Sequence, residues 1–177
     1  MALTADNVVV GRTGKVYVAD TTATGPTASD STLSGFTELG YVSTDGVTYT
    51  TDKTTQQIRA WQNGDLIREV VTEGTATYEF MLMESNQDVI ELYFGSTMTG
   101  GKIEANPTAT GGAKSFVIDV VDGDKVIRHY IPRGEVLSIS EQSFVNGDAV
   151  MYGVVITAYV TEDRAADIFY SEFESES

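Results

Sequence analysis

The alternation of apolar and polar side chains is what most limits the folds open to this chain. Within residues 75–83 (TATYEFMLM), the apolar side chains would share one face of a strand: Ala76, Tyr78, Phe80 and Leu82. This period of two is typical of a half-buried β-strand. Further strand signals lie at 15–19, 36–42, 46–50, 66–72, 114–121, 125–131, 135–144 and 149–161. Strand signals of this number, with little helical pattern, predict a mainly β protein.

Turn signals join these strands in pairs. Asp45-Gly46, the segment 122–124 (DGD) and the segment 145–148 (VNGD) each predict a hairpin turn. The pattern predicts two packed antiparallel sheets, a β-sandwich or barrel, in a single domain covering residues 1–177. A last strand at 149–161 would run roughly 40 Å, so we expect it to bend and to serve both sheets.

One segment, residues 85–95 (SNQDVIELYFG), changes to a helical period. Its apolar residues fall on one helical face: Val89, Ile90, Tyr93 and Phe94. Ser85 and Asp88 are spaced as a capping box, and Gly95 is placed for a C-terminal cap. We therefore expect one short α-helix near 86–94, flanking the sheets.

Three long segments, at 20–35, 51–65 and 96–113, are polar and are predicted as extended loops. Unstructured loops longer than about 12 residues are uncommon in a compact domain and are usually functional. The second loop leads from a polar octet (TTDKTTQQ) to Ile58 and to Trp61, the only tryptophan. We infer that copies of the chain itself order these loops.

The C-terminal residues 162–177 are predicted to form either an arm that becomes ordered on a partner or a short helix. Their acidic end is expected to fray.

The acidic charge narrows the choice of partners. The chain has 11 basic and 26 acidic residues, a net charge of −15. Such a protein cannot gain affinity for DNA by releasing counterions from phosphates. Without cysteine, disulfides and thiolate metal sites are excluded. We expect neither a membrane span nor a signal peptide, because no apolar run is long enough and the first residues lack the signal pattern.

The single histidine, His129, is the only candidate for a catalytic base. It alternates with Ile127 and Ile131 in a predicted strand, which favours a structural role. No nucleophile elbow, phosphate-binding loop or histidine pair is present. The sequence therefore predicts no catalytic residues.

Carboxylates could form a glycosidase pair or a calcium site. Glu69, Glu79 and Asp119 lie at strand positions where alternation already calls for an outward polar residue. Asp122 and Asp124 resemble part of a calcium loop, but a tight turn explains them better. We expect no metal and no cofactor.

Several segments in the first 95 residues occur in an order and spacing that are typical of one protein family. They are Gly14 to Ala19, a Gly-rich loop ending near Pro26, LGYVSTDGV at 39–47, and the strand–Glu84–helix passage at 75–95. In this order and spacing the chain resembles the major tail tube proteins of long, non-contractile-tailed bacteriophages, especially those of actinobacterial hosts. The second half matches only in strand pattern, and the loop ADTTATGPT is longer and richer in threonine than is usual.

The resemblance implies two packed sheets with an outer helix, and rings of six subunits whose sheets join into an inner β-barrel. Rings would stack into the tail tube of a virion, from subunits made in the host bacterial cytoplasm. The tube would hold the tape-measure protein and then double-stranded DNA, which passes without specific binding. Tail terminator and distal tail proteins would close its ends. An acidic lumen would repel the duplex and leave it free to slide.

Under this hypothesis a long hairpin loop reaches a neighbouring subunit. The expected stacking residues are Thr51, Asp52, Lys53, Thr54, Thr55, Gln56, Gln57, Ile58, Arg59 and Trp61. Glu69, Glu73 and Glu79, on the adjoining strands, are expected to face the lumen. The alternative is a β-sandwich module that binds carbohydrate or a cell surface. Such a module should gather aromatic side chains on one face, whereas here they are spread along the strands.

Overall fold

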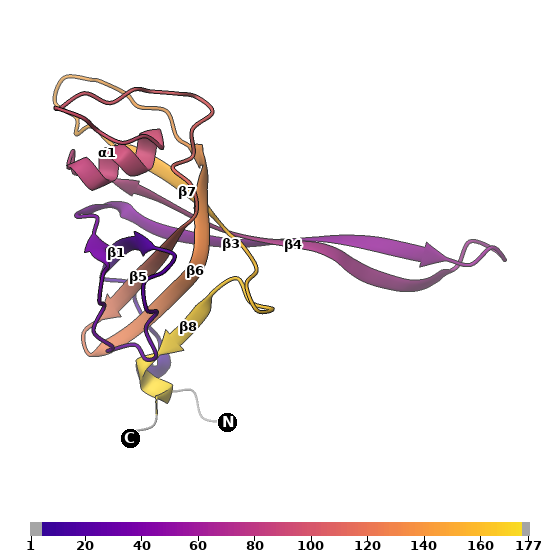
Figure 1. Cartoon of the computed structure of the whole chain (residues 1–177). Helices are drawn as coiled ribbons and strands as arrows, with labels where there is room; N and C mark the ends of the chain where they lie inside the picture. Colours follow the sequence, from indigo (N-terminus) through magenta and orange to yellow (C-terminus); the bar gives the residue numbers. More distant parts are fainter. Residues whose placement is uncertain (1–4, 175–177) are drawn as a thin grey trace.

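The computed structural model describes residues 5–174. Its one α-helix is α1 (Gln87–Phe94), and single 3₁₀ turns lie at Ala5–Asn7 and Ser171–Phe173. The strands are β1 (Thr13–Asp20), β2 (Thr37–Glu38), β3 (Val42–Arg59), β4 (Leu66–Leu82), β5 (Lys114–Asp122), β6 (Lys125–Ile139), β7 (Tyr152–Ala158) and β8 (Asp167–Tyr170) (Figure 1). None of these helices is long and apolar enough to cross a membrane.

The strands form one eight-stranded sheet in the order β2-β1-β5-β6-β7-β4-β3, and β8 also pairs with β6. Every pairing is antiparallel. The mainly β class and the single short helix are confirmed. A division into two packed sheets is not seen, because the ladder continues from β2 to β3 without a break.

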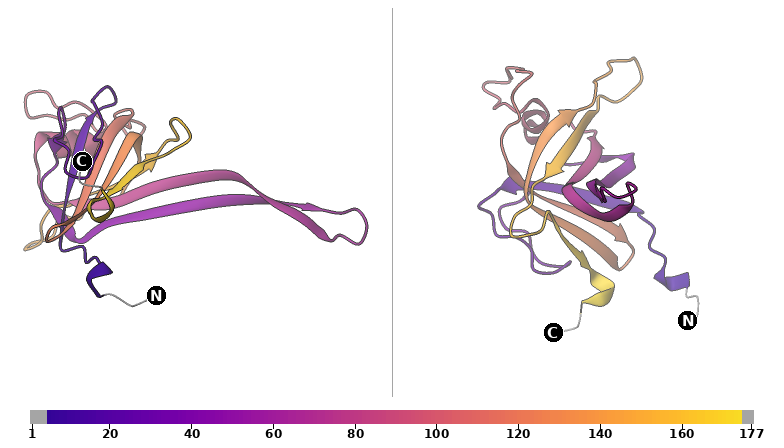
Figure 2. Two further views of the ribbon diagram at one scale, coloured as in Figure 1. Left: turned by 90° about the horizontal axis from the view of Figure 1, so that it is seen from below. Right: turned by 90° about the vertical axis from the view of Figure 1, so that its right-hand side faces the viewer.

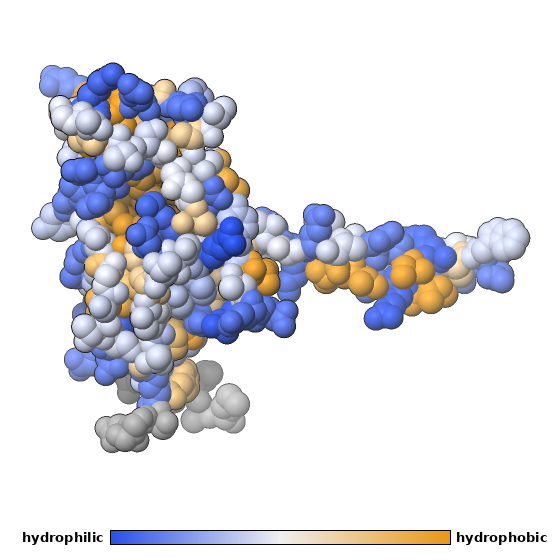
Figure 3. All heavy atoms as spheres, viewed as in Figure 1, coloured by the Kyte–Doolittle hydropathy of each residue, from blue (hydrophilic) through white to orange (hydrophobic). Residues whose placement is uncertain are grey.

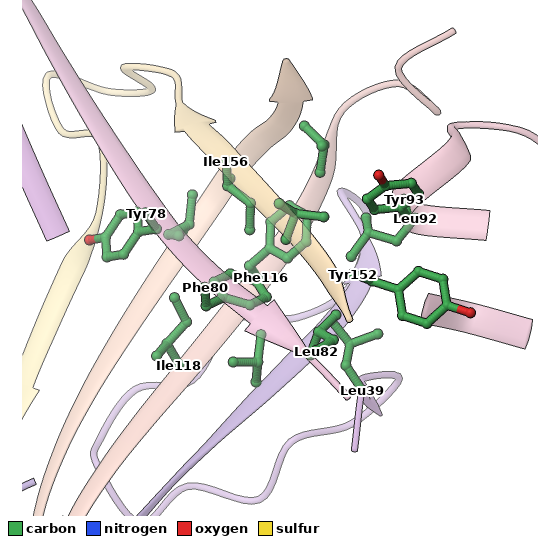
Figure 4. Close-up of a cluster of buried hydrophobic side chains, with 14 of the residues drawn as sticks. Leu39, Tyr78, Phe80, Leu82, Leu92, Tyr93, Phe116, Ile118, Tyr152 and Ile156 are labelled. Carbon is green, nitrogen blue, oxygen red and sulfur yellow. The ribbon is translucent and has the colours of Figure 1, made fainter. Parts of the chain in front are cut away.

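The sheet is curled (Figure 2). The buried apolar side chains of its strands and of α1 belong to one cluster. Val16 of β1 and Phe80 of β4 belong to the same buried cluster, although three strands separate their own strands in the sheet. Figure 4 shows Phe80, Phe116 and Ile156 together in this cluster. Because one sheet curls around these side chains, it encloses a core without a second sheet.

The last large strand differs from the sequence prediction. β7 covers only Tyr152–Ala158, and a loop at 140–151 separates it from β6. Of the apolar residues predicted to share one face of this strand, four are buried: Tyr152, Val154, Ile156 and Ala158. Val150 is only half-buried, and Val160, beyond the end of β7, is exposed. The strand with two successive partners on one edge is instead β6, which pairs with β8 over residues 127–130 and with β7 over residues 134–139.

The prediction of a hairpin turn at Asp45-Gly46 is wrong, because β3 continues through these two residues. The four residues 43–46 lie opposite a single residue of β4, Met81, and form a β-bulge. Gly46 has a φ of 69°, a conformation that a bulge and a hairpin turn can both use. The glycine thus serves a bulge within β3 rather than the predicted turn.

The N-cap of helix α1 lies one residue later than predicted. The side chain of Asn86, rather than Ser85, accepts a hydrogen bond from the Val89 amide at 2.9 Å. Asparagine is a strong N-cap because its side-chain oxygen satisfies an otherwise unpaired amide. The Ser85 hydroxyl instead accepts a hydrogen bond from Tyr152. Gly95 caps the C-terminus with a φ of 62°, as predicted.

One predicted loop and the C-terminal segment contain strands. Residues 51–59, predicted as loop, are strand, and only residues 60–65 form a turn. Their backbone pairs with β4, which requires no apolar side chain. Residues 162–174 contain strand β8 and a 3₁₀ turn rather than an α-helix, and residues 175–177 lie outside the described part.

Candidate functional site: a projecting hairpin

The outer halves of β3 and β4 leave the body as a two-stranded hairpin, residues 51–75, called here the tongue (Figures 1 and 2). β4 pairs with β7 only as far as Ala76, opposite Ala158. Beyond that point, within residues 5–174, the two strands pair only with each other. At about 3.3 Å per residue, residues 51–59 carry the tongue about 30 Å from the body.

Almost the whole tongue is open to solvent. Ala60 and Val70 are half-buried, and every other residue of 51–75 is exposed. An isolated two-stranded hairpin is at best marginally stable in water. A tongue of this length therefore has the properties of a segment that another surface covers.

Apolar side chains are concentrated on this exposed element (Figure 3). Residues directly opposite in an antiparallel ladder share a face, so Val70 lies on the face of Gln56 and Val71 on that of Thr55. Apolar groups thus occur on both faces. The exposed members are Ile58, Trp61, Leu66, Ile67 and Val71.

From the sequence, the β4 half of the tongue was not predicted to belong to the candidate site. Its residues 66–72 were predicted to be a strand, and only residues 51–59 and Trp61 were predicted to contact another subunit. The signal was present in LIREVV, where Leu66 and Ile67, and then Val70 and Val71, occur as adjacent apolar pairs rather than in alternation. Adjacent apolar residues place one side chain on each face of a strand.

The tip of the tongue is an ordered turn. The Ala60 amide donates to the Asp65 carbonyl at 2.8 Å, and Arg59 Nη1 donates to the Gly64 carbonyl at 3.1 Å. Gly64 has a φ of 70°, which permits the reversal of the chain. This turn leaves the side chain of Trp61 98% exposed.

An aromatic cluster anchors the root of the tongue to β6. The Tyr78 hydroxyl lies 3.1 Å from His129 Nδ1, and the Tyr49 ring lies 4.8 Å from that of Tyr78 and 5.8 Å from that of His129. Burial lowers the pKa of His129 and raises the pKa of Tyr78. Both side chains are therefore held in their neutral forms at the attachment point of the tongue.

Asp119 lies on the outer side of the sheet, as the alternation predicted, but it is not open to solvent. It is 6% exposed and Arg128 is 7% exposed, because the loop at 20–35 covers them. Arg128 Nε and Nη2 donate to the two Asp119 oxygens at 2.7 and 2.8 Å, and Nη1 donates to the Ser31 carbonyl at 2.8 Å. The pair attaches this loop to the outer side of the sheet.

Asp122 belongs to the tight turn between β5 and β6, as predicted. Its carboxylate accepts from the Val10 amide at 2.8 Å and from Arg12 Nε at 2.9 Å. Among the residues that the structure describes, no three acidic or histidine side chains are grouped so as to hold a metal ion.

The outward face of the sheet carries two polar rows that cross β3, β4, β7 and β6. They are Thr48–Glu79–Val155–Ser138 and Thr50–Thr77–Thr157–Glu135. None of these side chains is buried and none is basic. Hydrogen bonds from the Thr110 and Tyr159 hydroxyls lower the pKa of Glu135, so this carboxylate is held in its ionised form.

The three acidic residues expected to face the lumen lie in two different places. Glu79 is on the outward face of the body, in the first of these rows. Glu69 and Glu73 are on the tongue, where Glu69 accepts a hydrogen bond from the Thr55 hydroxyl at 2.7 Å. The ten expected stacking residues all lie on the tongue, with Trp61 at its tip.

Comparison with known proteins gives one sequence match. A family model described as "Phage tail tube protein" matches residues 1–172. No curated protein sequence matches the chain.

Solved structures with a similar course of the chain include the tail of an empty gene transfer agent particle, with a TM-score of 0.47 and 9% identity over 90% of this chain and 96% of that one. They also include the sheath-tube complex of an extracellular contractile injection system, with a TM-score of 0.47 and 11% identity over 94% of this chain and 93% of that one. A third is the tube-terminating cap of the anti-feeding prophage, with a TM-score of 0.46 and 14% identity over 95% of this chain and 98% of that one. Since these TM-scores lie below 0.5, the family assignment rests on the sequence match alone.

Proposed function

Because this chain belongs to the phage tail tube proteins, non-enzymatic structural subunits of the virion tail, we propose that it polymerises through its tongue into stacked rings. The observation that carries this proposal is a hairpin that projects about 30 Å and exposes apolar groups on both faces. The rings are hexameric, and the tail is the long, non-contractile type found among phages of actinobacterial hosts. The tongue is the contact between one ring and the next.

An open sheet edge supports ring formation. β3 ends the strand order, so one of its edges has no ladder partner among residues 5–174. An unpaired edge is a template for pairing with another chain. Joining these edges around a ring would close the sheets of six copies into one inner barrel and remove the exposed edges. Stacking identical, heterologous surfaces then gives an open polymer.

The polar rows on the outward face support a DNA conduit. Glu79 and Glu135 lie there among five threonine and serine side chains and Val155. One basic residue, Arg133, is close enough to Glu135 to act on its charge. Carboxylates in the lumen would repel the phosphates of double-stranded DNA, which then passes without specific binding. Before ejection the same lumen holds the tape-measure protein, and tail terminator and distal tail proteins cap the tube. Glu69 and Glu73 lie on the tongue, so their access to the lumen depends on where the tongue docks.

Electron microscopy of the purified chain tests the proposal. We expect negatively stained samples at high concentration to contain hollow tubes of uniform diameter. A chain that remains monomeric under every condition would contradict it.

A tongue-less variant tests the role of the hairpin. Asp52 and Thr75 are opposite each other in the ladder, so an Asn-Gly turn can replace residues 53–74 without leaving an unpaired strand. We expect this variant to keep the β-sheet circular dichroism spectrum of the body and to form no tubes. Normal tubes from it would show that the tongue is not the stacking element.

A further inference from the structure

Trp61 is the most exposed large apolar side chain among the described residues, at 98%. A tryptophan buries roughly 150–250 Å² when it is packed, and tryptophan is enriched at the energetic centres of protein interfaces. The ordered turn at the tip holds it away from the body formed by the described residues. A residue in this position has the properties of an interface anchor.

A pocket of matching character lies beside α1. It has a volume of about 300 Å³. This is at the lower end of the roughly 300–1,000 Å³ of small-ligand sites and suits one bulky side chain. Most of its lining is apolar, and Leu137 and Ile139 at its edge are 52% and 47% exposed. The walls come from α1, residues 105–110 and the end of β6.

We propose that Trp61 of one copy inserts into this pocket of a second copy. This inference rests on the proposed function and names the surface that the tongue contacts. The tongue carries Trp61 about 30 Å from its own body, so the pocket that receives it belongs to another subunit. Other exposed aromatic side chains, such as Phe144 and Phe173, lie on short segments of the body and lack this reach.

Charge complementarity favours a second copy as the occupant. The distal tongue, residues 56–68, carries Arg59 and Arg68 against one acidic residue, Asp65, within a chain whose net charge is −15. A second hollow shares Leu92 with the apolar pocket and has three charged lining residues, Asp88, Glu91 and Lys114, so its two carboxylates outnumber its one ammonium group. A hydrogen bond from the Met98 amide lowers the pKa of Glu91, which holds it ionised beside the docking surface.

The fluorescence of Trp61 provides a direct measurement, because it is the only tryptophan. We expect its emission to shift to the blue when tubes form. We expect Leu137→Arg, at the exposed edge of the pocket, to abolish both the shift and efficient assembly. Trp61→Ala should raise the critical concentration for assembly by about tenfold or more. The neighbouring change Gln62→Ala is the matched control and should leave that concentration unchanged.

Cysteine cross-linking identifies the pocket, since the native chain contains no cysteine. A chain with Trp61→Cys and Leu137→Cys should assemble above the higher critical concentration expected without Trp61, and mild oxidation of these tubes should give a ladder of disulfide-linked oligomers. A chain with Trp61→Cys and Asp124→Cys, in the exposed β5–β6 turn, is the control and should give no ladder.

The outcomes separate the two proposals. Tubes without a blue shift, or a ladder only in the control pair, would overturn the docking of Trp61 and leave the tube function intact. Undiminished assembly of Trp61→Ala would also overturn it. Failure of the native chain to form tubes would overturn the function and the docking together.

Discussion

At the scale of single residues, buried polar pairs determine where the long loops lie. Arg128 is almost fully desolvated, yet three of its donors have partners: two on Asp119 and one on the Ser31 carbonyl. A second contact joins the same loop to the C-terminal region, where the Ser29 amide and hydroxyl each donate to Glu174 at 2.6 Å. The loop at 20–35 is thus attached by specific hydrogen bonds rather than by an apolar core of its own.

Replacing Asp119 by asparagine should destabilise the subunit strongly. The change keeps the shape but leaves the buried Arg128 without a counter-charge, which costs about 3–5 kcal/mol in comparable pairs. Chemical denaturation followed by circular dichroism would measure the free energy of unfolding. The control is Glu38→Gln, which breaks an exposed pair with Lys15 and should cost far less. Equal losses from the two variants would show that Asp119 is not desolvated.

At the scale of elements, the tongue shows that a strand can form without a buried face. Its backbone is paired along both strands, and its threonines have a high strand propensity. Neither contribution replaces the apolar burial that stabilises β4 over residues 76–82. The stability of the tongue in a free subunit is therefore low, and contacts with other subunits supply the rest.

Hydrogen exchange should detect this difference between the two halves of β4. In the free subunit, amides of residues 51–75 are expected to exchange quickly, because local opening of an unsupported hairpin costs little free energy. In assembled tubes the same amides should exchange at least about tenfold more slowly. Residues 152–158 of β7 serve as the internal reference, protected in both states. A tongue already protected in the monomer would contradict its dependence on a partner.

At the scale of the whole molecule, charge is divided unequally between tongue and body. Residues 51–75 contain three basic side chains, Lys53, Arg59 and Arg68, and four acidic ones, and so contribute only −1 of the net −15. The element proposed to contact other subunits is nearly neutral, while the bodies repel one another. This division allows contact through the tongue and leaves the acidic charge on the remaining surfaces.

Salt should therefore promote assembly. Raising ionic strength from 0.01 to 0.15 M shortens the Debye length from about 30 Å to about 8 Å, which screens repulsion between acidic bodies. We expect the critical concentration for tube formation to fall over this range, measured by light scattering and confirmed by electron microscopy. A critical concentration that rises with salt would mean that attraction between opposite charges dominates the contacts.

Several features of the fold follow from local sequence patterns. Alternation identified the buried residues of β4 and β7, Gly95 identified the end of α1, and the turn after Asp122 was correctly placed. These features depend on interactions between neighbours in the chain, which local spacing reveals. The candidate site was predicted in part. Residues 51–59 and Trp61 were proposed to contact another subunit, but the pairing of residues 51–59 with residues 66–75 was not predicted.

By itself, the sequence determined that the chain is a mainly β, strongly acidic protein with one short helix and no disulfide. The tertiary structure alone decided that one sheet curls around the core, that Asp45-Gly46 is a bulge, and that Asp119 is buried beneath a loop. It also decided that residues 51–75 form a ladder outside the body. Each of these depends on which distant segments lie together, and a polar side chain has the same local pattern whether water, a loop or another subunit covers it.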